Sequence, residues 1–253
     1  MLDSSVTNPP FLNHYESFFD KTSKSFSNRC LSRATGECDL PIIDLSALRS
    51  SIEGERRACV KAIAEASSEW GFFQVLNHGV SQQLLMEMRR EQVKVFNMPF
   101  EKKASCGMLN DSYRWGTPSA MSLEQFSWSE AFHVPLNKIS QEGCCPLEFT
   151  SLREAMEKLA EEMSKLARTL AGVLAENAWS NDLYKSVKHK VMANKRVERY
   201  SIAYFLCPSY DSVIGSCSGT SLYKQFTFGE FRRQVQEDVK TTGQKVGLPR
   251  FLI

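Results

Sequence analysis

Three polar residues near the C-terminus, His189, Arg199 and Ser201, are of types that together could hold a metal ion and an organic acid. Ferrous iron that must bind both an oxidisable cosubstrate and dioxygen is held by two histidines and one carboxylate on one face of an octahedron, which leaves three positions open. A bidentate 2-oxo acid fills two of those positions, and the planar fork of an arginine beside a hydroxyl suits its distant carboxylate. His189 is therefore a candidate metal ligand, and Arg199 and Ser201 are candidate anchors for the acid.

The spacing of these residues decides whether they can converge. Arg199 and Ser201 are two apart in a strand-like stretch, so their side chains would point to the same face. If the turn over residues 194–196 is an odd-length hairpin loop, His189 lies across from Ser201 and shares that face. The alternative is a hydrogen-bonded core histidine and a surface arginine, which is the commoner origin of such a pair. The residues by themselves leave both interpretations open.

Composition bounds the class of protein. The 253 residues are 42% hydrophobic and 24% charged, which is enough to bury a sizeable core. The net charge of +2 is spread along the chain without a basic block, so nucleic acid is not an expected partner. No apolar run has the length of a signal peptide or a membrane span, so we expect no membrane association. The expected location is cytoplasmic or both cytoplasmic and nuclear. The eight cysteines are expected to be free thiols.

Short strands are predicted on both sides of the first helix. Residues 1–39 are rich in Ser, Asn, Thr and Pro without periodicity, which predicts an irregular leader. LPIIDLSAL (40–48) predicts a buried strand and turn, and GFFQVLNHGV (71–80) predicts a second strand that ends at an Asn-His-Gly turn. Further strand-like stretches are residues 129–136, 178–194 and 199–208.

Four helices are predicted from three-and-four spacing and from capping residues. Apolar residues between positions 59 and 70 mark one face of the first helix, and Ser81 can cap a second that ends near Asn97. SLRE (151–154) is a capping box that opens a helix to about Asn177. TFGE (227–230) is a second capping box, and it predicts a helix that ends at Gly243. The stripe of the long helix is formed by Leu152, Met156, Leu159, Met163, Leu166, Leu170 and Val173.

Several long strings together resemble the plant iron(II)- and 2-oxoglutarate-dependent dioxygenases. They are LPIIDLSAL, WGFFQVLNHGV, and His189 followed by Arg199-Tyr200-Ser201. FSWSEAFHVPL (126–136), YSIAYFLCPSYDSVIGSC (200–217) and FTFGEFRRQVQEDVKTTGQKVGLPRFL (226–252) further resemble gibberellin 2-oxidases, in particular the subgroup that acts on C20 gibberellins.

The resemblance implies an α+β fold in which an N-terminal helix and strand region packs against a jelly roll, the double-stranded β-helix. It also implies that His189 is the second histidine ligand of Fe(II), and that Arg199 and Ser201 hold 2-oxoglutarate. The family reaction couples oxidative decarboxylation of 2-oxoglutarate, with ascorbate as reductant, to 2-beta-hydroxylation of a gibberellin, which inactivates the hormone. The implied domains are a leader (1–39), an N-terminal dioxygenase region with the long helix (40–177) and a C-terminal jelly-roll remnant (178–253).

The sequence departs from the family pattern where the first iron ligands are expected. The four histidines His14, His78, His133 and His189 are followed by Tyr-Glu, Gly-Val, Val-Pro and Lys-Val, so none begins the family's His-x-Asp pair. The Asn-x-Tyr-Pro-Pro-Cys-Pro segment is absent as well. Both would belong between LAGVLAEN and AWSNDLYKSVKHKV, so a block is expected to be missing at Asn177/Ala178, as a skipped exon or a gene-model error would produce.

The missing block predicts an incomplete jelly roll and loss of hydroxylase activity, because one imidazole cannot hold ferrous iron in a facial site. Three alternatives follow. A working enzyme would need other ligands, such as His133 with Glu130, but residues three apart on a strand face opposite sides. A non-catalytic isoform could instead bind a protein partner or the full-length enzyme. A third possibility is a product that does not fold stably.

Overall fold

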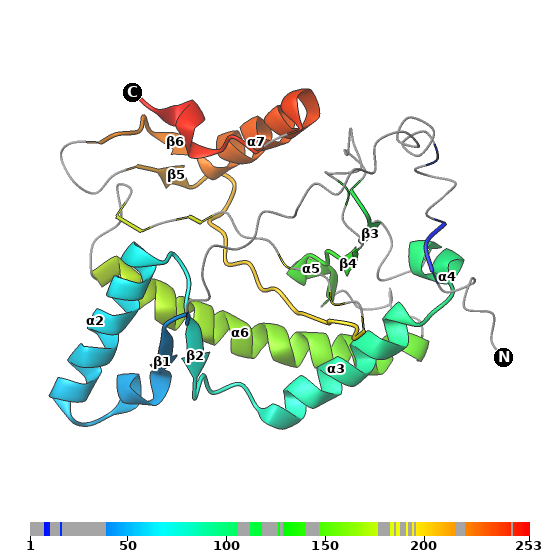
Figure 1. The fold of residues 1–253 in the computed structure, drawn as a ribbon, viewed down its shortest axis with the longest axis horizontal. Coiled ribbons are helices and arrows are strands. Elements are labelled where there is room, and N and C mark those ends of the chain that lie inside the picture. Colours follow the sequence, from blue (N-terminus) through cyan, green and yellow to red (C-terminus); the bar gives the residue numbers. More distant parts are fainter. Residues whose placement is uncertain are drawn as a thin grey trace. The chain divides into compact units, whose positions relative to one another are not determined.

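The described residues form two compact units. The computed structural model (Figure 1) describes residues 8–10, 16, 39–105, 112–117, 126, 129–139, 147–176, 183–184, 186–187, 191, 194, 196–215, 221–243 and 245–253. Gln82–Ala160 makes up the body of one unit, and Asp39–Ser81 with Glu161–Ile253 makes up the other. The predicted irregular leader (1–39) lies almost entirely outside the described residues.

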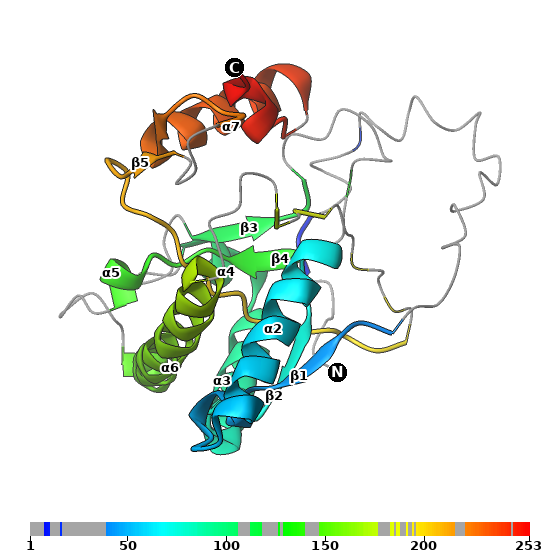
Figure 2. The same ribbon diagram turned by 90° about the vertical axis from the view of Figure 1, so that its left-hand side faces the viewer.

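A short parallel strand pair begins the second of these units. β1 (Ile42–Asp44) and β2 (Gln74–Leu76) pair with Ile43 opposite Val75. The 3-10 helix η1 (Leu45–Arg49) follows β1, and α2 (Glu53–Glu69) then lies against the strand pair (Figure 2). Both predicted strands and the predicted helix between them are confirmed.

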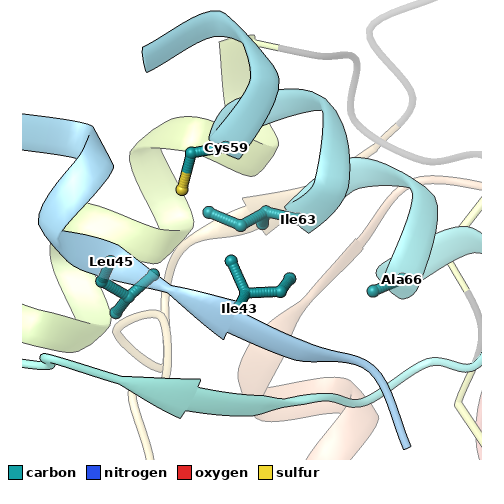
Figure 3. Packing of buried hydrophobic residues seen from close by; sticks show 5 residues of the cluster. All are labelled: Ile43, Leu45, Cys59, Ile63 and Ala66. Carbon is teal, nitrogen blue, oxygen red and sulfur yellow. The ribbon is translucent and has the colours of Figure 1, made fainter. Parts of the chain in front are cut away.

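The core of this unit is built from β1, η1 and α2. Ile43, Leu45, Cys59, Ile63 and Ala66 are all buried and point toward one another (Figure 3). The periodic helix face predicted from sequence is therefore the face that packs. Residues of the second half of α6 pack around this cluster, namely Leu166, Leu170, Val173 and Leu174.

The other unit combines helices with an antiparallel strand pair. α3 (Gln82–Phe96) begins directly after Ser81 and is followed by α4 (Phe100–Ser105). β3 (Tyr113–Trp115) and β4 (Glu130–Phe132) pair antiparallel, and α5 (Leu136–Ile139) and the 3-10 helix η4 (Leu147–Phe149) follow. The predicted strand at 129–136 is therefore confirmed in a shorter form. Ring contacts join the helices to the strands at Phe96–Phe132 (5.4 Å between centroids) and Phe100–Tyr113 (6.1 Å), and join the two strands at Tyr113–Phe132 (5.1 Å).

The long helix α6 (Thr150–Glu176) matches its predicted extent. Leu152, Ala155 and Leu159 are buried near its N-terminus. Farther along, the stripe is only half-buried, at Met163, Leu166, Leu170 and Val173. The predicted capping role of Ser151 is corrected, because the helix begins one residue earlier and the Ser151 hydroxyl donates to Glu91 Oε2 at 3.0 Å.

The C-terminal residues form a small helix and hairpin. β5 (Val213–Ile214) and β6 (Phe226–Thr227) pair antiparallel and lead into α7 (Phe228–Thr242). The predicted capping box is present, since the Thr227 hydroxyl accepts from Glu230 N–H and the Glu230 carboxylate accepts from Thr227 N–H. Gly243 ends the helix with a φ of 71°, a conformation that glycine adopts readily.

A terminal 3-10 helix, η5 (Leu248–Phe251), packs back on α7. Arg250 donates from Nε and Nη2 to the buried Asp238 carboxylate at 3.0 and 2.9 Å. Phe226 and Phe251 lie with their ring centroids 4.2 Å apart. Backbone and side-chain contacts thus tie the last residues of the chain to the helix before them.

The predicted strand at 199–208 is wrong. In Figure 1 this stretch is a yellow to orange coil without an arrow, and it holds no regular secondary structure. A strand needs a neighbour for its N–H and C=O groups, and none of the three two-stranded sheets in the described part of the chain includes these residues. Nor do the described residues of the stretch predicted at 178–194 form a strand.

Candidate functional site

The predicted 2-oxoglutarate anchors lie on the surface. Arg199 and Ser201 are both exposed, in the coil that replaces the predicted strand. His189, the predicted iron ligand, lies outside the described residues. The convergence of the three side chains therefore stays a prediction, and the shared strand face on which it depended is not formed.

The alternative metal pair of His133 and Glu130 is not assembled. The Glu130 carboxylate accepts from Lys103 Nζ at 2.5 Å and from the Tyr113 hydroxyl. His133 is exposed, and its backbone N–H donates to the Ser112 carbonyl at 2.8 Å. Because Glu130 is committed to two other partners, the carboxylate that this alternative needs is not available to a metal.

Lys103, Tyr113 and Glu130 form a buried polar cluster that the sequence did not reveal. Lys103 is 0% exposed, and its ammonium also donates to the Phe96 carbonyl at 3.1 Å. Burial, together with the hydrogen bond to Glu130 and the charge of that carboxylate, raises the pKa of Tyr113. A lysine in a short helix normally points to solvent, so no signal in the sequence identified this one as buried. The cluster joins α4 to the strand pair.

The Asn-His-Gly turn after β2 has a structural role. His78 Nδ1 accepts a hydrogen bond from the Val80 N–H at 3.1 Å, so its ring bonds to a backbone group of its own turn. Asn77 has a φ of 51°, and its side chain donates to Asp44 Oδ2 at 2.8 Å. This bond, with those from Ser46, lowers the pKa of Asp44. The turn therefore links the ends of the two parallel strands.

A groove of about 710 Å³ lies between α2 and the second half of α6. Its lining includes three basic side chains, of which Arg56 and Arg57 contact Glu53 and Lys61 lies 3.5 Å from Glu65. Leu48, Val60, Ala64 and Val173 line it as well. Each basic side chain therefore already has an acidic neighbour that would compete with an organic acid for it.

The family's iron does not fit the donors that the described residues bring together. Within the described ranges, no three His, Cys, Asp or Glu side chains gather in an arrangement that could hold a metal ion. Neither α6 nor any other described helix combines the length and hydrophobicity needed to cross a bilayer.

Comparison with known proteins defines the class. Residues 40–146 match the N-terminal region named for a non-haem dioxygenase in morphine synthesis, and residues 174–208 match the 2OG-Fe(II) oxygenase superfamily. The chain belongs to the plant 2-oxoglutarate- and Fe(II)-dependent oxygenase family, and within it resembles the gibberellin 2-oxidases. The expected family is therefore confirmed, and Fe(II) and 2-oxoglutarate are the cofactors of that family.

The relatives contain internal positions that this chain lacks. It is 41% identical to gibberellin 2-beta-dioxygenase 6 of Oryza sativa subsp. japonica, covering 85% of each chain, and 42% identical to gibberellin 2-beta-dioxygenase 8 of Arabidopsis thaliana, covering 85% of this chain and 88% of the relative. Gibberellin 2-beta-dioxygenase 5 of Oryza sativa subsp. japonica is 34% identical over 343 positions, with 98% of this chain and 97% of the relative covered. Since this chain has 253 residues, at least 90 of the 343 aligned positions have no counterpart in it.

Proposed function

We propose that this chain is a gibberellin 2-oxidase-like protein that does not hydroxylate gibberellins. In its full-length relatives the proposed reaction is 2-beta-hydroxylation of C20 gibberellins. One observation carries the proposal: none of the four histidines begins a His-x-Asp pair. Ferrous iron in this chemistry requires two histidines and a carboxylate on one face, so His189 alone would leave the metal without two of its three ligands.

The aligned relatives support a missing internal block. An alignment that covers nearly all of both chains, yet leaves at least 90 positions unmatched, requires that the unmatched positions lie inside the chain rather than at its ends. We place the loss at Asn177/Ala178, directly after α6. The exposed coil at 202–207 supports this placement, because it is an apolar surface for which a complete barrel would supply partners.

The proposed remnant keeps one iron ligand and the residues that anchor 2-oxoglutarate. His189 would be the surviving iron ligand, and Arg199 and Ser201 would be the surviving anchors for the far carboxylate of 2-oxoglutarate. The fold of residues 178–253 would then be an incomplete jelly roll. Arg199 lies in a coil rather than on a sheet, so even the carboxylate anchor would lack the rigid support that oriented binding needs.

Succinate formation tests the proposal. The purified chain is incubated with ferrous iron, 2-oxoglutarate, ascorbate and a C20 gibberellin, and succinate and hydroxylated gibberellin are measured by mass spectrometry. We expect no signal above an iron-free reaction, whereas rice gibberellin 2-beta-dioxygenase 6, assayed in parallel, serves as the positive control. Iron-dependent succinate from this chain would overturn the proposal.

A second candidate function is that of a non-catalytic isoform that binds another protein. The observation that favours it is the exposure of apolar side chains between residues 197 and 213, among them Val197, Phe205, Tyr210 and Val213. Co-expression with a tagged full-length relative tests it: the two proteins should elute together in size-exclusion chromatography. Separate elution at all concentrations would count against this function.

A further inference from the structure

Residues 202–207 form an apolar segment whose backbone has no hydrogen-bonding neighbour among the described residues. Its side chains Ile202, Phe205 and Leu206 are 42%, 76% and 47% exposed. None of the backbone bonds of turns and loops, and none of the strand ladders in the described ranges, involves these six residues. Each unpaired N–H and C=O group is left to water, while large apolar side chains beside it also face water.

The composition of this segment favours a strand. Its sequence, Ile-Ala-Tyr-Phe-Leu-Cys, contains β-branched and aromatic residues, no charge, no glycine and no proline, and Pro208 ends it. Six-residue segments of this kind with exposed edges are the ones that add to a strand of another chain. The coil conformation is therefore explained by the lack of a neighbour and not by low strand propensity.

A second copy of this chain is the occupant that best fits the segment. Every copy exposes the same six residues, so two copies offer each other matching rows of N–H and C=O groups and matching apolar side chains. The segment carries no charge, so like charges do not oppose such pairing. The aligned relatives have at least 90 positions that this chain lacks, so a second copy shares the same need for a neighbour.

We propose that residues 202–207 pair as a β-strand with the same segment of a second copy, so that the chain self-associates. A contact of one short strand per copy is smaller than a standard protein interface of about 1,600 Å². Self-association should therefore be weak and reversible, with a dissociation constant in the micromolar range. This proposal goes beyond the proposed loss of hydroxylase activity, but it rests on the same missing internal block.

Sedimentation velocity of the full chain, compared at about 1 µM and about 100 µM, tests the proposal. Two variants remove the pairing: Ala203→Pro deletes a ladder N–H, and Phe205→Lys replaces the most exposed apolar side chain of the segment with a charge. The matched control is Met86→Lys, which changes an exposed apolar residue of α3 in the other unit. Helical circular dichroism is recorded for each variant, since residues 202–207 contribute to no helix.

The expected result is a rise in mean sedimentation coefficient with concentration for the wild type and for Met86→Lys, and a constant monomer value for Ala203→Pro and Phe205→Lys with unchanged helical signal. A wild type that stays monomeric over this range would overturn the proposal. So would self-association that both segment variants retain. If the wild type stays monomeric by itself but binds the full-length rice relative, the proposal is overturned. The segment would then be assigned to that partner.

Discussion

At the residue scale, the buried charged side chains among the described residues are not the predicted cofactor-binding residues. Lys103 is fully buried and contacts Glu130, the Phe96 carbonyl and the ring of Tyr113. Arg199 and Ser201, by contrast, are exposed. Burial of a charge costs several kcal/mol unless it is paired and hydrogen-bonded, so the cluster around Lys103 must stay intact for its unit to fold.

Replacing Lys103 tests this role. Lys103→Met leaves the carboxylate of Glu130 without its cation, and we expect the free energy of unfolding to fall by about 3 to 5 kcal/mol. The control is Lys102→Met on the same helix, where the exposed side chain should change stability by less than about 0.5 kcal/mol. Urea denaturation followed by circular dichroism measures both. Equal midpoints for the two variants would show that the buried pair contributes little.

At the element scale, one buried carboxylate joins two helices. Glu91 on α3 accepts from Lys94 Nζ at 2.7 Å and from the hydroxyl of Ser151, in the first turn of α6, at 3.0 Å. Burial of Glu91 raises its pKa, but the bonds from Lys94 and Ser151 and the charges of Lys94 and Arg90 outweigh it, so the pKa lies below its usual 4.5. The contact supports the start of the longest helix.

This linkage predicts a pH dependence. Because the pKa of Glu91 is lower in the folded than in the unfolded chain, its contribution to stability is present above about pH 4.5 and is lost as the pH falls below that value. Glu91→Gln should lower stability at neutral pH by about 1 to 3 kcal/mol and make the acid limb of the stability profile shallower.

Urea denaturation at a series of pH values between neutral and acid measures the effect. Glu87→Gln, one turn earlier on α3, is the control, because Glu87 bonds only to the exposed Gln83 among the described contacts. It should keep the wild-type profile. Parallel profiles for the wild type and Glu91→Gln would contradict the linkage.

At the scale of the whole molecule, elements near the N-terminus share a buried core with α6, while the strands after α6 are short. β1, β2, α2 and the second half of α6 share a buried core. Among the described residues after α6, regular structure comprises the two-residue strands β5 and β6, the helix α7 and the 3-10 helix η5. This contrast agrees with the proposed loss of an internal block.

A chimera tests where the block belongs. The residues of rice gibberellin 2-beta-dioxygenase 6 that align to the gap are inserted between Asn177 and Ala178, and succinate is measured as above. We expect iron-dependent succinate formation, because the insertion would bring back the His-x-Asp pair to act with His189, Arg199 and Ser201. Alanine in place of the inserted histidine is the control and should abolish the signal. A chimera that melts cooperatively yet stays inactive would contradict the proposed position.

Much of the fold follows from local sequence. The apolar spacing around Cys59 and Ile63 identified the packed face of α2, and the Thr227 capping box with Gly243 identified both ends of α7. The strand at 199–208 could not be judged locally, because its residues have high strand propensity and yet residues 202–207 pair with no strand in the described part of the chain. Buried Lys103 and Glu91 were missed for a related reason: their partners lie far away in the sequence.

The sequence by itself determined the family, the four main helices and the absence of a His-x-Asp pair, because motifs, helical periodicity and helix caps depend on residues close together in the chain. Only the tertiary structure decided that Glu130 is held by Lys103 and Tyr113, and that residues 202–207 form no strand. The physical reason is that ion pairs and strand ladders need a second partner, and that partner comes from a distant part of the chain.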